Sequence, residues 1–157
     1  MPAVKTARLA EAMSIWRIHP TAAELTERGR GNLAGHLGIR ITTIGDDFLE
    51  ATMPVEPRLH QPFGVLHGGA SLALAETVGS VAAMLCVTPE EMCLGQEINA
   101  NHLRAVREGT LTATARPWHL GRRSQVWHIE IRDAAERLVC ISRLTMAVVP
   151  RGREGAA

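Results

Sequence analysis

Polar and hydrophobic residues alternate in several short segments of the chain. The alternation first shows at Leu37, Ile39 and Ile41, and it resumes over residues 49–53 after a turn at Gly45-Asp46. Side chains of a β-strand point alternately to the two faces of a sheet, so these segments predict an antiparallel hairpin. Four later segments with the same period predict four more strands, at about residues 97–101, 110–115, 127–132 and 138–149.

A segment of different character lies between these strands, from His67 to Val87. Its hydrophobic residues cover nearly every face of a helix, which is typical of a buried helix, and its length corresponds to about 30 Å. One long helix and an antiparallel sheet can each bury the other. We therefore expect an α+β fold in which an antiparallel sheet of five to six strands wraps around one long central helix at about residues 67–87.

The ends of the chain lie outside this pattern. Thr21 and Glu24 have the spacing of a capping box and predict a short helix that ends near Gly29. The proline-containing segment 56–66 predicts a loop, and 157 residues suit one domain. We divide the chain into an N-terminal arm with a short helix, one folded domain and a disordered tail, at residues 1–30, 31–150 and 151–157.

The composition argues against several classes of function. A net charge of +1 and five aromatic residues give no reason to expect nucleic acid as a partner. The seven histidines form no HExxH or paired metal spacing, and no GxSxG nucleophile motif is present, so we expect no metal and no serine-hydrolase site. Residues 101–157 hold ten basic and five acidic side chains, which allows an anion-binding face there.

The cysteines and the apolar segments bear on the compartment. Cys86, Cys93 and Cys140 are an odd number without CxxC spacing, which favours reduced thiols. No signal peptide is visible, and Glu76 interrupts the longest apolar stretch, whereas a membrane span needs about 20 apolar residues. We expect a soluble, cytoplasmic protein that does not bind membranes.

Glu76 does not suit a purely structural helix. It stands among Leu72, Ala75 and Val78, and an ionised carboxylate is costly to bury without a partner. One interpretation is that Glu76 faces a polar seam or pairs with an arginine of the sheet. The other is that it is a catalytic carboxylate, acting as a base or a nucleophile.

The start of the helix offers a second candidate for chemistry. His67-Gly68-Gly69 would place glycine N–H groups at the positive end of the helix dipole, where a substrate oxygen could approach closely. An ordinary glycine-rich helix start with a capping histidine is the alternative. His67 and Glu76 are nine residues apart, which means about 13 Å of rise and about 180° of rotation. If both serve one site, a two-fold dimer must supply the second residue.

Three sequence segments together resemble the hotdog-fold acyl-CoA thioesterases. They read QPFGVLHGGASLALAETVGSVAA, GQEINANHLRAVREG and HLGRRSQVWHIEI, and the resemblance extends from Gly31 to Val149. It is strongest to the branch that includes the Arthrobacter-type 4-hydroxybenzoyl-CoA, the 1,4-dihydroxy-2-naphthoyl-CoA and the phenylacetate-degradation thioesterases. The resemblance implies hydrolysis of an acyl- or aroyl-coenzyme A to free acid and coenzyme A.

The resemblance also implies roles for individual residues. Glu76 would be the nucleophile or general base, and the Gly68 N–H would polarise the thioester carbonyl. Gln61 and His67 would position the thioester or its water, and the Ser80 hydroxyl would assist the attack. Val81 and Met84 would line the acyl pocket. The substrate or its coenzyme A part would be met by Gly95, His102, Arg104, His119, Gly121, Arg122, Arg123 and Ser124.

The resemblance further implies a homodimer, with dimers pairing into a homotetramer, and no cofactor, since coenzyme A is part of the substrate. Two alternatives remain at this point. One is a non-catalytic hotdog module that binds an acyl thioester. The other is a hotdog dehydratase, for which His67 and Glu76 would also be suitable residue types.

Overall fold

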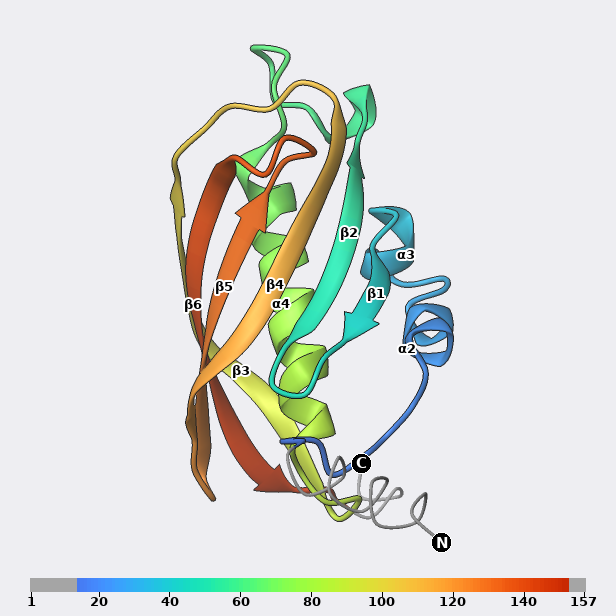
Figure 1. Ribbon diagram of the computed structural model, residues 1–157, viewed down its shortest axis with the longest axis vertical. Helices are drawn as coiled ribbons and strands as arrows, with labels where there is room; N and C mark the ends of the chain where they lie inside the picture. The colour runs from blue at the N-terminus through green and yellow to red at the C-terminus, as the bar shows by residue number, and fades with distance from the viewer. Residues whose placement is uncertain (1–13, 153–157) are drawn as a thin grey trace, which may run out of the picture.

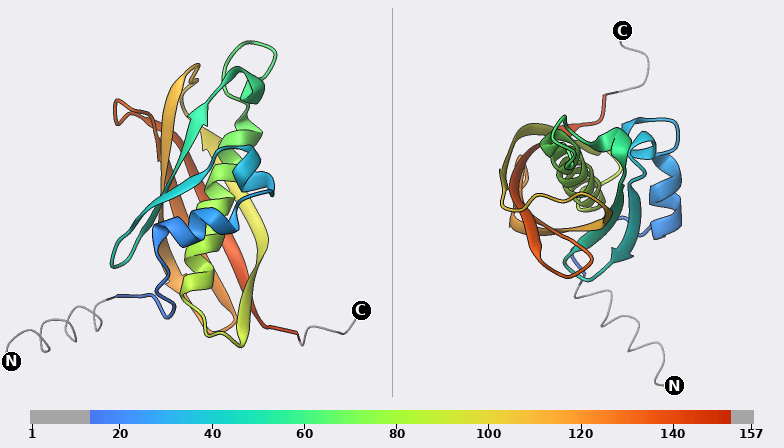
Figure 2. Two further views of the ribbon diagram at one scale, coloured as in Figure 1. Left: turned by 90° about the vertical axis from the view of Figure 1, so that its right-hand side faces the viewer. Right: turned by 90° about the horizontal axis from the view of Figure 1, so that it is seen from above.

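The computed structural model describes residues 14–152 (Figure 1), and in this part of the chain six strands form one antiparallel sheet in the order β1-β2-β4-β5-β6-β3. The sheet curls around the long helix α4, which Figure 2 shows nearly end-on in its right-hand view. This arrangement confirms the predicted fold class. The strands are β1 (Arg40–Ile44), β2 (Leu49–Val55), β3 (Glu91–His102), β4 (Gly109–Leu120), β5 (Ser124–Arg132) and β6 (Leu138–Pro150), and the helix is α4 (Gly68–Leu85).

Alternation along the strands places their hydrophobic side chains against α4. Every second residue of β2, from Leu49 to Val55, is buried, and β5 has the same pattern around Trp127. Gly79 lets the helix approach the sheet closely, because a Cβ there would lie 2.6 Å from Cδ2 of Leu144. The core therefore lies between one face of α4 and the concave face of the sheet.

The prediction that α4 is buried on every side is wrong. One face of the helix is exposed or half-buried in the single chain. The sheet covers only part of the helix circumference, and a helix of small apolar residues does not reveal which part. The open face carries Gly69, Leu72, Ala73, Glu76, Thr77, Ser80, Val81 and Met84. By length and composition alone α4 could also cross a membrane, but here it is the core helix of the sheet.

Two strands begin elsewhere than predicted. β1 starts at Arg40 rather than Leu37, because the preceding residues form the short helix α3 (Leu33–His36). β3 starts at Glu91, six residues earlier than predicted, and a bulge between Gly95 and Glu97 interrupts the alternation that would have marked it. The predicted loop 56–66 contains a short 3-10 helix, η1 (Pro57–Leu59).

The helix α2 (Ala22–Arg28) begins with the predicted capping box. Thr21 accepts a hydrogen bond from the Glu24 N–H, and Glu24 accepts one from the Thr21 N–H. α2 packs beside β1, where the Thr26 hydroxyl accepts a hydrogen bond of 3.0 Å from the Ile41 N–H. The first part of the predicted arm and the end of the predicted tail, residues 1–13 and 153–157, lie outside the described residues.

Candidate active site

The N-terminus of α4 carries the first group of predicted site residues. His67 is the N-cap, and its Nδ1 accepts a hydrogen bond of 2.8 Å from the Gly69 N–H. A neutral imidazole that accepts through Nδ1 carries its proton on Nε2, so Nε2–H is left to donate outward. Gly68 is the first helical residue, and its N–H has no partner within the helix. The capping interpretation of His67 is therefore confirmed, and the capped terminus still presents two donors.

His102 lies against Gly68 in this group. A Cβ at Gly68 would lie 2.9 Å from Nε2 of His102, so a larger residue there would require the exposed imidazole to shift. A pocket of about 330 Å³ opens at this point between the start of α4 and the end of β3. Its lining includes four of the predicted site residues, namely Gln61, Gly68, His102 and Arg104.

The loop that carries Gln61 is fixed from both sides. The Gln61 side-chain oxygen accepts a hydrogen bond of 2.6 Å from the Phe63 N–H. Arg107, in the β3–β4 loop, donates to the carbonyl oxygens of Gly64 at 2.9 Å and Phe63 at 3.5 Å. The sequence interpretation did not single out Arg107, because no local pattern relates it to a loop more than 40 residues earlier.

The second group lies at the middle of α4. Glu76 is exposed, and its carboxylate lies beside Gly95 of β3, where a Cβ would be 3.2 Å from Oε1. No basic side chain among residues 14–152 lies within 4.0 Å of the carboxylate, so the predicted pairing with an arginine is wrong for the described part of the single chain. Ser80 lies one turn further on, half-buried, and its hydroxyl donates to the Met146 sulfur at 3.8 Å.

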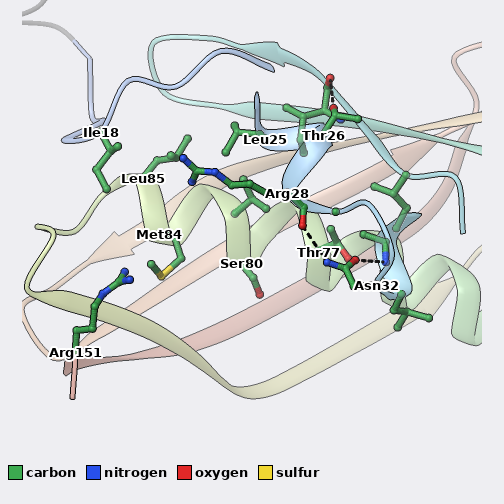
Figure 3. Close-up of a pocket in the computed structure, with 16 residues that line it drawn as sticks. Ile18, Leu25, Thr26, Arg28, Asn32, Thr77, Ser80, Met84, Leu85 and Arg151 are labelled. Carbon is green, nitrogen blue, oxygen red and sulfur yellow. Dashed lines mark hydrogen bonds between the residues drawn. The ribbon is translucent and has the colours of Figure 1, made fainter. Parts of the chain in front are cut away.

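A pocket of about 510 Å³ begins beside this group (Figure 3). Val81 and Met84, the two residues predicted for an acyl pocket, line it together with Thr77 and Ser80 of the same helix. Its opposite wall comes from α2, α3 and β1. The resemblance implied no site residue in these three elements. The sequence predicted α2 but contained no signal for where α2 packs. The remaining lining residues are Ile18, Leu25, Thr26, Arg28, Gly29, Asn32, Leu33, Ala34, Ile39, Ile41, Leu85 and Arg151.

The third group is the turn between β4 and β5. The Gly121 N–H donates to the Ser124 carbonyl at 2.9 Å, and the Arg123 carbonyl accepts from the Val148 N–H at 2.9 Å. A Cβ at Gly121 would collide with the His119 imidazole. Arg122 and Arg123 are exposed. The turn therefore has a defined backbone and two guanidinium groups directed at solvent.

A single chain does not bring the three groups together. His67 and Glu76 are separated by about 13 Å along α4 and by about half a turn around it. On β6, His102 pairs with Cys140 and Ser124 pairs with Ala147, so these partners are seven residues or about 23 Å apart. The predicted coenzyme A contacts thus lie at opposite ends of the sheet. Among the described residues, no three His, Cys, Asp or Glu side chains gather as a metal site would require.

Comparisons with known proteins agree on the family. The model of the thioesterase superfamily matches residues 63–140, which include α4 and the strands from β3 to β5. The 1,4-dihydroxy-2-naphthoyl-CoA hydrolase of Escherichia coli is 55% identical over 135 residues, covering 86% of this chain and 99% of that protein. The proofreading thioesterase EntH of Cronobacter turicensis is 52% identical over 135 residues, covering 86% of this chain and 98% of that protein.

A solved structure agrees as well. The crystal structure of thioesterase HI1161 from Haemophilus influenzae has a TM-score of 0.87 and 48% sequence identity, covering 90% of this chain and 99% of that one. Fold, motifs and relatives therefore lead to the same conclusion: the chain belongs to the thioesterase superfamily and is a thioester hydrolase with the hotdog fold.

Proposed function

We propose that the protein hydrolyses an acyl- or aroyl-coenzyme A thioester, with Glu76 as the reacting carboxylate and the start of α4 as the site that polarises the carbonyl. One observation carries the proposal: within residues 14–152, the same helix has a Gly68 N–H with no partner in the helix at its His67-capped start, and a carboxylate with no ion-pair partner in its middle. The relatives named as a coenzyme A thioester hydrolase and a proofreading thioesterase support the substrate class.

The chemistry follows from the charge that develops in the reaction. As the carbonyl carbon is attacked, negative charge grows on its oxygen, and the Gly68 N–H at the positive end of the helix dipole stabilises it. In the proposal, the Nε2–H of His67 and the Gln61 amide orient the same group. The carbon–sulfur bond then breaks, and coenzyme A leaves as a thiolate, which needs no strong acid. The proposed reaction uses no cofactor.

Glu76 supplies the other half of the reaction. It either attacks the carbonyl carbon, giving an anhydride that water hydrolyses, or removes a proton from the attacking water. When water attacks the Glu76 carbon of the anhydride, the acid product keeps an oxygen from Glu76 and the carboxylate takes its new oxygen from water. In the general-base route, water supplies the oxygen of the acid product directly. Hydrolysis in heavy-oxygen water over several turnovers separates the two routes, because label enters the Glu76 carboxylate only when it attacks directly.

We further propose that two copies of the chain build each site. β3, a strand of twelve residues, stands at one edge of the sheet, and within residues 14–152 no strand pairs with its outer side. A two-fold axis that pairs β3 with a second β3 brings the His102 end of one strand beside the Gly95 half of the other. The same operation moves the Gln61–Gly68 group of one copy toward the Glu76 of the other. It also moves His102 and Arg104 toward Arg122 and Arg123.

In such a dimer, His102 and Arg104 of one copy and Arg122 and Arg123 of the other form one phosphate-binding site. Arginine binds phosphate through paired N–H donors, and coenzyme A carries several phosphate groups. The proposal includes the homotetramer and the cytoplasmic location expected from the sequence. The three free thiols support the location, since a reducing compartment keeps cysteines unpaired.

Release of free thiol from coenzyme A thioesters tests the function. The wild-type protein is expected to release coenzyme A from an acyl or aroyl panel, and Glu76→Ala to lower kcat by about a hundredfold or more. Because Glu76 is exposed, the melting temperature should stay close to that of wild type.

Glu130→Ala is the matched control, since this carboxylate lies on β5 and pairs with Arg132 at 2.7 Å. It should keep wild-type kcat. Binding of thioesters without release of thiol would instead favour a non-catalytic module. Loss of water from a 3-hydroxyacyl thioester would favour a dehydratase. Near-normal activity of Glu76→Ala would contradict the mechanism.

A further inference from the structure

The pocket of about 510 Å³ has a charged end that thioester hydrolysis does not explain. Its walls are largely apolar, with Leu25 and Ile39 facing the second half of α4. Arg28 of α2 and Arg151, which follows β6, complete the lining. Figure 3 shows both guanidinium groups at the end of the pocket where α4 ends, near Met84 and Leu85, whereas Asn32 lies at the opposite end.

Neither guanidinium is neutralised within the described part of the chain. Among residues 14–152, no carboxylate lies within 4.0 Å of Arg28 or Arg151. Arg151 donates one long hydrogen bond, of 3.4 Å, to the Glu91 carbonyl. Both arginines are exposed, and each borders the apolar pocket. A guanidinium in this position is suited to bind an anion that enters the pocket, because it binds a carboxylate through two parallel N–H donors.

The backbone that carries Arg28 is held in place. The Asn32 side-chain amide donates to the Arg28 carbonyl at 3.1 Å, and the Asn32 carbonyl oxygen of the same side chain accepts from the Ala34 N–H at 3.0 Å. Thr26 fixes α2 to β1 through Ile41. Arg28 therefore extends from a rigid support rather than from a free loop.

The distance along α4 sets the length of the ligand. Glu76 and Met84 are eight residues apart, or about 12 Å of helix. An acyl group whose carbonyl lies at Glu76 would pass Ser80 and Val81 and reach the arginines with its far end. We propose that the enzyme prefers acyl groups with an apolar body and a carboxylate at the end remote from the thioester, and that Arg28 and Arg151 determine this preference. The inference rests on the proposed function.

Pairs of substrates that differ only in the remote carboxylate test this preference. We would measure kcat/KM for octanedioyl-CoA against octanoyl-CoA, and for 6-carboxy-2-naphthoyl-CoA against 2-naphthoyl-CoA. The carboxylated member of at least one pair is expected to be preferred about tenfold or more, as for a hydrogen-bonded charge pair. In the double variant Arg28→Met, Arg151→Met the ratio should fall to about one, since methionine keeps the apolar length without the charge.

Arg30→Met is the matched control. Arg30 lies two residues from Arg28 but pairs with Glu27 at 3.0 Å and does not line the pocket. It should keep the wild-type preference. Equal ratios in the wild type and the double variant would overturn the inference while leaving the proposed function intact.

Failure of the proposed function gives a different result, namely no thiol release from any of the four substrates. Calorimetry with the free acids then decides the inference. Tighter binding of octanedioate than octanoate, lost in the double variant, supports the charged pocket. Equal binding overturns it.

Discussion

At the start of α4, His67 and Gly68 fulfil a structural and a chemical requirement together. Capping by Nδ1 fixes the imidazole and leaves Nε2–H outward, while the glycine beside it lies against His102. In the proposed reaction, the N–H of this glycine meets the thioester oxygen. The motif in the sequence predicted these positions. It did not predict that Glu76 is exposed, because a helix of alanines, glycines and serines looks the same whether the sheet covers all of it or half.

Also at the residue scale, burial lowers the expected reactivity of two cysteine thiols. Burial, with a smaller contribution from neighbouring Cys93, raises the pKa of Cys86 to about 12, and burial raises the pKa of Cys93 to about 11. At pH 8 only about one Cys86 in ten thousand would be a thiolate, against about one in ten for an ordinary thiol with a pKa of 9. We expect both thiols to react with a disulfide reagent at least about a hundredfold faster in urea-unfolded than in native protein.

The raised pKa values of the thiols also determine how the free energy of unfolding changes with pH. The unfolded chain ionises its thiols near pH 9, before the folded chain does, so the free energy of unfolding should fall as the pH rises from 9 toward 12. Below pH 9 this contribution to stability is fully present. A native thiol that reacts as fast as the unfolded one would contradict the burial of these residues.

At the scale of elements, the loop before α4 is held by Arg107 of the β3–β4 loop. Arg107 bonds two carbonyls of the segment that carries Gln61, and the Leu66 N–H donates to the Val106 carbonyl at 2.8 Å. Two loops far apart in the sequence thus form one unit beside the start of α4, where we propose that the thioester carbonyl is polarised. Such a link arises from tertiary packing, as does the docking of α2, and periodicity alone does not contain it.

Arg107→Ala is therefore expected to loosen this unit. It should lower kcat by about tenfold with a smaller change in KM, because orientation in the transition state suffers more than binding. Arg107→Lys should recover part of the loss. Arg116→Ala, which removes an exposed ion pair of 2.7 Å with Asp47, is the control and should keep wild-type kcat. An unchanged kcat in Arg107→Ala, with the fold intact, would exclude a positioning role for Arg107.

At the scale of the whole molecule, the proposed dimer uses both the open face of α4 and the free edge of β3. The sequence predicted the fold class from period and element order, and the nine-residue spacing of His67 and Glu76 already required a second chain for a shared site. The structure shows that the two basic groups are also far apart in one chain, about 23 Å along β6. The lining of the pocket of about 510 Å³, which we propose holds the acyl group, could not be predicted in full, since one of its walls comes from α2, α3 and β1.

The most direct test of the two-chain active site uses two inactive variants. His67→Ala and Glu76→Ala proteins are mixed in equal amounts, unfolded and refolded together, and assayed for release of coenzyme A. About half of the dimers should be hybrids, each with one intact site, so activity should return to about a quarter of wild type. No recovery, with hybrid dimers confirmed by mass, would mean that one chain builds the whole site and would contradict the account.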